Sequence, residues 1–197
     1  MQESLTVTDH KAISAPASSV APALSQMLIQ EKDHVCFFTG HRIIPQGELL
    51  SLREVLLQQI EALYYQGYTV FLSGGARGFD LLAASAALLV RRHHPEIRVI
   101  MVIPCQDQDL NWSRSDSAFY RELLLRCETC PLSDEPYRRG CMQKRNRFMV
   151  DHASLGIAYH KHARSGTEMT VRYAEKKGVS IINLRTLLEK KQTQTSE

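Results

Sequence analysis

Apolar residues occur along this chain in two alternating patterns. Short runs in which most residues are apolar, such as HVCFFTG at 34–40, are typical of strands buried on both faces of a sheet. Longer stretches carry an apolar residue every three or four positions, as from Leu49 to Leu63, which predicts an amphipathic helix ending near Gly67. Strands are predicted at 34–40, 68–74, 97–104, 154–161 and 179–184, with a weaker candidate at 128–133, and further helices at 79–94, 112–127, 141–153, 166–178 and 185–191.

The alternation of strands and helices predicts an α/β fold. We expect a single doubly wound, mostly parallel sheet with helices on both faces, which is Rossmann-like. In such sheets a ligand binds outside the carboxyl ends of the strands, where the strand order reverses. The loops that could form a site therefore follow the strands, at Thr39–Arg42, Ser73–Asp80, Pro104–Trp112 and His160–Thr167.

The two ends of the chain are poor in periodic apolar residues. Residues 1–31 are rich in Ser, Ala, Pro, Thr and Gln, which predicts a flexible N-terminal arm with at most a short helix near Leu24–Ile29. Residues 191–197 are polar and are expected to fray. The Rossmann-like domain is accordingly placed at 32–190.

Composition and charge narrow the class of protein. A net charge of +3, from 24 basic and 21 acidic residues, is too mild to indicate nucleic-acid binding. No apolar run approaches the roughly 20 residues that cross a membrane, and the first residues lack the pattern of a secretory signal, so a cytoplasmic location is expected. The 5 cysteines are irregularly spaced, and the single C-x-x-C at Cys127 and Cys130 has no second ligand pair. Reduced thiols are favoured over a disulfide framework or a metal site.

The segment SGGARGFD, residues 73–80, is a glycine turn between a predicted strand and a predicted helix. Glycines allow a sharp turn and a close ligand, and a helix N-terminus favours phosphate. The spacing completes neither the ATPase loop nor G-x-G-x-x-G, so an ordinary turn and a phosphate cradle both fit. The candidate ligand-binding residues here are Ser73, Gly74, Gly75, Ala76, Arg77, Gly78 and Asp80.

Two further loops are expected at the same sheet edge. The first, TGHR, contributes Thr39, Gly40, His41 and Arg42; the second, SGT, contributes Ser165, Gly166 and Thr167 at the start of a helix. The basic helix 141–153 adds Arg145 and Asn146, unless its charges form a solvated face. Trp112 is either a core anchor or a surface on which a base stacks. Several small and polar loops at one edge favour a ligand site over simple connections.

The segments TGHR, SGGARGFDLLAA, NWS, KRNRFMVDHASLGIAYH and SGTEMTVRYAEKKG together resemble the YpsA-like family, in the expected order, over roughly residues 34–184. That family belongs to the SLOG superfamily, which also contains DprA/Smf and the LOG phosphoribohydrolases. The resemblance implies a Rossmann-like fold that binds a nucleotide or a nucleotide derivative. It implies roles for the glycine turn with Asp80, for the Arg145–Asn146 pair, and for Gly166 and Thr167.

Two departures from the superfamily pattern are visible. Ser165 stands where the second loop usually has a first glycine, which could narrow the backbone conformation. LOG enzymes are similar over this loop but carry a catalytic Glu three residues after the Thr, where this chain has Thr170. Glu168 lies at a different helical angle. Binding is therefore favoured over catalysis, and whether the chain is an enzyme stays open.

The expected ligand is of the ADP-ribose or nucleoside phosphate type, and no other cofactor and no metal is predicted. Main-chain N–H groups of 74–78 and 165–167, with Thr39 and Arg42, would hold phosphate, while Asp80 or Asn146 would meet ribose or base. The alternatives are a nucleotide hydrolase using Asp80, Asp107, Asp109 or Glu168, and a DprA-like single-stranded DNA binder. Nucleic acid and membrane are not expected as partners, whereas self-association is compatible with the resemblance.

Overall fold

The computed structural model describes residues 17–161 and 164–194, and the side chains of 21–161 and 164–190. Within these residues a six-stranded sheet has the order β4-β3-β2-β1-β5-β6, and every pairing is parallel. The strands are β1 (Val35–Gly40), β2 (Val70–Ser73), β3 (Arg98–Ile103), β4 (Glu128–Pro131), β5 (Leu155–Tyr159) and β6 (Ser180–Asn183). The predicted Rossmann-like α/β fold is confirmed.

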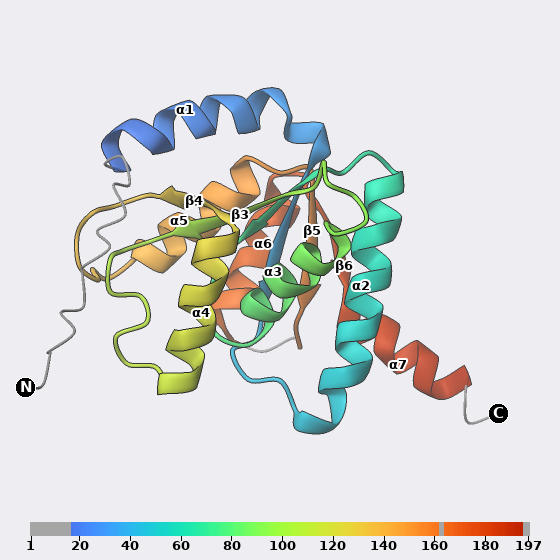
Figure 1. Cartoon of the computed structure of the whole chain (residues 1–197). Helices are drawn as coiled ribbons and strands as arrows, with labels where there is room; N and C mark the ends of the chain where they lie inside the picture. The colour runs from blue at the N-terminus through green and yellow to red at the C-terminus, as the bar shows by residue number, and fades with distance from the viewer. Residues whose placement is uncertain (1–16, 162–163, 195–197) are drawn as a thin grey trace, which may run out of the picture.

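Helices cover both faces of this sheet (Figure 1). They are α1 (Ala17–Gln30), α2 (Leu49–Tyr65), α3 (Phe79–Val90), α4 (Arg114–Arg126), α5 (Cys141–Asp151), α6 (Gly166–Lys176) and α7 (Leu184–Gln194), with short 3₁₀ turns at Lys32–His34 and Gln46–Glu48. One apolar layer joins α2, α3, α4 and α7 to the sheet, and the other joins α1, α5 and α6. None of the described helices combines the length and apolar character needed to cross a membrane.

Neighbouring residues of the central strand serve opposite layers. In β1 the Phe37 side chain packs with α1, α5 and α6, whereas Phe38 packs with α2, α3 and α7, and both are fully buried. Because both faces are covered, the strand reads as a continuous apolar run rather than an alternating one. The same geometry separates the C-x-x-C cysteines: Cys127 packs against the first layer and Cys130 lies in the second.

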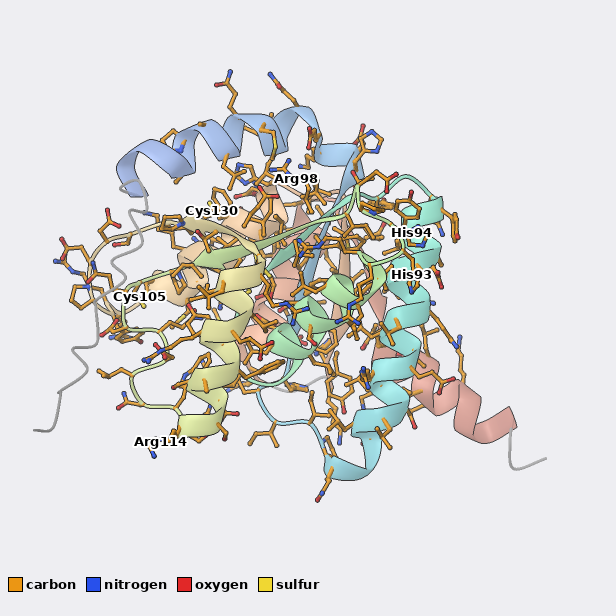
Figure 2. The ribbon with its side chains drawn as sticks, viewed as in Figure 1. His93, His94, Arg98, Cys105, Arg114 and Cys130 are labelled. Atoms are coloured by element: carbon orange, nitrogen blue, oxygen red, sulfur yellow. The ribbon has the colours of Figure 1, made fainter. Side chains whose placement is uncertain are left out.

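Helix α1 differs from the flexible arm expected for residues 1–31. Residues 17–30 are helical, with Pro22 inside the helix, and Leu28 is fully buried. Arg98 anchors the end of α1: its guanidinium donates to Met27 Sδ at 2.6 Å and lies 3.7 Å from the Glu31 carboxylate (Figure 2). Tertiary packing thus stabilises a helix whose composition is weakly periodic. Residues 1–16 and 195–197 lie outside the described part, while 191–194 continue α7.

The strand order reverses between β1 and β5. From β1 the chain builds outward through β2, β3 and β4, and it then returns to the other side of β1 for β5 and β6. The loops after β1 and β5 therefore leave the sheet in opposite directions and open a crevice between them. They stay linked by a hydrogen bond from His41 N to Tyr159 O at 3.1 Å.

Candidate functional site

A cavity of about 480 Å³ lies at this reversal, a size typical of small-molecule sites. Its walls come from the end of β1, the turn into α3, and helices α5 and α6. The predicted residues that line it are Thr39, Gly40, His41, Arg42, Ala76, Asp80, Arg145, Asn146, Ser165, Gly166 and Thr167. Segments far apart in the sequence thus meet at the reversal of strand order, where doubly wound sheets bind their ligands.

Five predicted residues lie outside this lining: Ser73, Gly74, Gly75, Arg77 and Gly78. The hydroxyl of Ser73 donates to the Asp80 carbonyl at 2.9 Å and accepts from the Gly75 N–H at 3.2 Å. Arg77 pairs with Asp116 at 3.8 Å on the α4 side. These residues build the turn below the cavity rather than its surface.

The glycines of this turn are required by close approach and by backbone conformation. A Cβ on Gly74 would lie 2.0 Å from the Arg145 guanidinium. Gly78 has φ +76°, and a Cβ there would also meet the Arg42 carbonyl at 2.4 Å. The turn therefore closes against α5 on one side and against the TGHR loop on the other, which it could not do with larger residues.

Asp80 is a buried carboxylate, 5% exposed, at the base of the cavity. Burial raises its pKa to about 6, and the opposing influences are the Arg145 charge and hydrogen bonds from the Ala76 and Gly40 backbone N–H groups. The carboxylate thereby joins the end of β1 to the start of α3. The Asp80 carboxylate oxygens thus accept hydrogen bonds from the protein, and the residue also lines the cavity.

A chain of side-chain hydrogen bonds connects the glycine turn to α6. Arg145 is 3% exposed and donates to the Gly74 carbonyl and, through Nε, to the Asn146 amide oxygen at 2.6 Å. The Asn146 amide nitrogen donates to the Thr170 hydroxyl at 2.8 Å, and Thr170 donates to the Gly166 carbonyl at 2.9 Å. Helix α5 thus fixes the positions of the two loops relative to each other.

Ser165 begins α6 as an N-cap. Its hydroxyl accepts from the Glu168 N–H at 3.1 Å, and its backbone is extended, with φ −149° and ψ 165°. Any residue adopts this conformation, so the replacement of the usual glycine by Ser165 does not restrict the loop. The next residue, Gly166, faces open space: a Cβ built there would meet no atom within 4 Å.

The lining of the cavity is strongly cationic. Besides Arg145 it contains Arg42, Arg147, Arg172 and Lys176, whereas Asp80 is the one carboxylate among the described lining residues. His41 adds no charge near neutral pH, because burial, with neighbouring cationic groups, lowers its pKa. Its Nε2 accepts from the Lys161 N–H at 2.8 Å, which assigns the neutral ring. This excess of cations suits an anionic ligand.

The other acidic candidates do not line the cavity. Glu168 pairs with Arg172 at 2.5 Å and with His160 at 3.5 Å. Asp107 accepts from the Tyr137 N–H at 2.6 Å, and Asp109 pairs with Arg121 at 3.1 Å.

Trp112 is a core anchor: its ring packs edge-on against the Tyr120 ring, with 5.3 Å between the ring centroids. Among the described residues, no group of three or more His, Cys, Asp or Glu is placed to hold a metal ion.

Sequence reasoning missed most residues of the helical walls of the cavity. The additional lining residues are Met142, Gln143, Arg147, Met169, Thr170, Arg172, Tyr173 and Lys176. Within α6 they recur at Met169, Arg172, Tyr173 and Lys176, which is one face of a helix. That spacing is visible in the sequence, but a mixed polar face of a helix is equally typical of simple exposure to solvent, so the spacing alone does not indicate a site.

Known proteins resemble this chain in sequence and in fold. The YpsA family model, described as the YspA SLOG family, matches residues 45–187. An uncharacterized SPbeta prophage-derived protein, YoqJ of Bacillus subtilis, is 29% identical over 65% of this chain and 82% of its own length. The UPF0398 protein YpsA of the same organism is 24% identical over 66% of this chain and 73% of its own length.

Two solved structures of DNA processing protein A share the fold. The Streptococcus pneumoniae protein has a TM-score of 0.58 and 20% identity over 78% of this chain, which spans half of that longer chain. The Helicobacter pylori protein, whose title describes single-stranded DNA binding, has a TM-score of 0.58 and 21% identity over 84% of this chain and 76% of its own. At this identity the likeness concerns the fold alone. The family match over most of the chain goes further: this protein belongs to the YspA SLOG family.

Proposed function

We propose that this protein binds a nucleotide or a nucleotide derivative in the cavity between β1 and β5. The observation that carries the proposal is the position and charge of this cavity. It lies where doubly wound sheets bind ligands, and cationic side chains from the β1 loop, α5 and α6 surround a single buried carboxylate. A ligand with phosphate groups matches this excess of positive charge.

In the proposed complex the phosphate lies against the first turn of α6, near Gly166 and Thr167, and is paired by Arg42. The N-terminus of a helix favours anions through its free N–H groups and its dipole. In the proposed complex the glycine turn has a different role from the one predicted, because two of its N–H groups, those of Gly75 and Ala76, already bond to Ser73 and Asp80. It supports the floor of the cavity instead of holding phosphate.

The remaining ligand groups would meet the α5 side. The amide of Asn146 is bonded at both ends, to Arg145 and to Thr170, and therefore positions other side chains. The ring of Tyr173 lines the cavity and provides an aromatic surface for a base, with the Arg147 guanidinium 5.5 Å from its centroid.

A melting-temperature panel tests the proposal. The protein is heated with ADP-ribose, AMP, ADP and the phosphate-free nucleoside adenosine, each at millimolar concentration. We expect at least one phosphate-bearing compound to raise the melting temperature, because a ligand that binds only the native state stabilises it, by about 2.7 kcal/mol at a hundredfold excess over Kd. Adenosine should have a smaller effect. Equal shifts with and without phosphate would contradict a site built for anions.

Nucleotide hydrolysis is a second candidate, favoured by Asp80 alone. A carboxyl group with a pKa of about 6 suits general acid–base work near neutral pH. Thr170, however, occupies the position of the LOG glutamate, and Glu168 does not line the cavity. Chromatography of AMP incubated with the protein tests this reading: release of adenine that Asp80→Asn abolishes would establish it, and unchanged AMP would leave binding as the function.

Single-stranded DNA binding is a weaker third candidate. Such surfaces combine a basic groove with several stacking aromatic rings. Among the described residues that line this cavity, Tyr173 is the one Phe, Tyr or Trp. We expect a fluorescent thymidine oligonucleotide to show no anisotropy change even at low salt, and tight binding there would favour the DprA-like reading instead.

A further inference from the structure

Two cysteines that are distant in the sequence come together beside the wall of the cavity. Cys105 follows the end of β3 and is 1% exposed, whereas Cys141 is half-buried and is the first residue of α5. The side chains of Cys141 and Asp107 both lie close enough to Cys105 to interact with its thiol. Figure 2 labels Cys105 at the start of the long loop between β3 and α4.

Backbone contacts hold the two cysteine-bearing segments side by side. The Gln106 N–H donates to the Glu135 carbonyl at 3.1 Å, and the Tyr137 N–H donates to the Asp107 carboxylate at 2.6 Å. The segment 135–137 leads directly into α5. These hydrogen bonds thus hold the loop after β3 against the segment that leads into α5.

We propose that Cys105 and Cys141 form an oxidisable pair, which hydrogen peroxide or a related hydroperoxide converts to a reversible disulfide at the start of α5. The fold sets this pair apart from the C-x-x-C: Cys127 and Cys130 pack into opposite layers of the molecule and face away from each other. The pair was not visible in the sequence, because only the fold joins the β3 loop to α5.

The two cysteines have different roles in the reaction. Cys141 is half-buried, whereas Cys105 is 1% exposed, so Cys141 is the thiol that a peroxide reaches first. Its sulfur attacks one peroxide oxygen: an S–O bond forms, the O–O bond breaks, and the leaving hydroxide takes a proton to become water. Burial, together with Cys141 and Asp107, raises the pKa of Cys105 to about 12, so Cys105 remains a thiol during this step.

Cys105 then resolves the sulfenic acid on Cys141. Its sulfur attacks the Cys141 sulfur, the S–S bond forms, and the S–O bond breaks. The hydroxide leaves as water with the proton that Cys105 gives up. In total two thiols lose two electrons and two protons, and one hydrogen peroxide is reduced to two water molecules. An external dithiol reverses the change.

The test combines thiol counting with peptide mapping on the full chain. The reduced protein is treated with hydrogen peroxide, denatured, and titrated for free thiols, and its tryptic peptides are analysed by mass spectrometry. We expect the wild type to lose two of its 5 thiols and to yield an intramolecular Cys105–Cys141 cross-link that dithiothreitol removes. Cys127→Ser, which replaces another half-buried cysteine, is the matched control and should also lose two thiols.

The single variants separate the two steps. Cys141→Ser should lose no thiol pair, whereas Cys105→Ser should accumulate a sulfenic acid on Cys141 that dimedone traps. An intermolecular cross-link, a cross-link through other cysteines, or dimedone labelling of Cys141 in the wild type as strong as in Cys105→Ser would overturn the proposal. These readouts use no ligand, so they stand apart from the proposed nucleotide binding.

Discussion

Asp80 is a buried carboxylate whose surroundings pull its pKa in opposite directions. Desolvation raises the pKa, while Arg145 and two backbone N–H groups lower it, and the net result is about 6. Arg145 is itself buried, and it meets the Gly74 carbonyl where any Cβ would collide with it. The glycine, the arginine and the aspartate therefore form one unit at the floor of the cavity, in which a change at one residue affects the other two.

Asp80 makes stability depend on pH. Because its pKa is raised from 3.8 to about 6, the native state binds more protons than the unfolded chain in this window, and the wild type loses stability as pH rises through it. The amide introduced by Asp80→Asn cannot titrate. The difference in unfolding free energy, Asp80→Asn minus wild type, should rise by about 2 kcal/mol between pH 4 and pH 7. Urea denaturation at several pH values measures it, with the exposed Glu54→Gln as control. A difference that stays flat or falls over this range would refute the assignment.

At the scale of elements, helices α1 and α6 are stabilised by different interactions. Helix α1 depends on tertiary packing, through Leu28 and the contacts that Arg98 makes with its last turn. Helix α6 is capped locally by the hydroxyl of Ser165, and its N-terminal end reaches the cavity. The first kind of stabilisation is hard to infer from sequence, whereas a Ser at the start of a predicted helix is a recognisable capping residue.

Docking of α1 predicts opposite outcomes for two adjacent residues. Leu28 is fully buried and Ile29 is 61% exposed. Leu28→Ala should lower the unfolding free energy by about 3 kcal/mol, because it removes buried methyl groups and leaves a cavity. Ile29→Ala should change it by no more than about 0.5 kcal/mol. Denaturant unfolding compares the two variants, and equal losses would mean that α1 does not pack as described.

The cap of α6 predicts a graded effect at Ser165. Ser165→Ala removes the acceptor of the Glu168 N–H and should cost about 1 kcal/mol of stability, while Ser165→Gly should cost only a few tenths. Thermal or urea unfolding of both variants measures the order. A larger loss with Gly than with Ala would show that the hydroxyl is not what stabilises this turn.

The strands and the main helices could be predicted because their apolar patterns are strong, whereas β4 was a weak candidate because it is a short edge strand with exposed residues. Only a short part of helix α1, near Leu24–Ile29, was predicted, because Ser, Ala and Pro obscure its period and Leu28 is buried by packing in the folded molecule. At the site, the loops could be predicted from the strand ends. The hydrogen-bond partners of the Gly75 and Ala76 N–H groups could not be predicted, because the Ser73 and Asp80 side chains come next to these groups only in the folded structure.

At the scale of the whole molecule, the strand order determines where the residues of the candidate site come together. Reversal between β1 and β5 opens the crevice, α5 and α6 close its sides, and the chain of hydrogen bonds from Gly74 to Gly166 holds the walls together. Loops from distant segments thus form a single cationic cavity. The proposed function requires that a nucleotide bind in this cavity rather than at another surface of the molecule.

A matched pair of glycine variants tests that claim most directly. Gly166 lines the cavity and Gly47 lies outside it, and at both positions a Cβ would meet nothing within 4 Å. Gly166→Glu adds bulk and negative charge to the cavity, yet a carboxylate at a helix N-terminus is compatible with folding. Gly47→Glu adds the same charge elsewhere. Calorimetric titration with ADP-ribose, or with the nucleotide that gives the largest melting shift, should show unchanged affinity for Gly47→Glu and an affinity at least about tenfold lower for Gly166→Glu, a loss of about 1.4 kcal/mol. Equal affinity of both variants and the wild type would contradict the account.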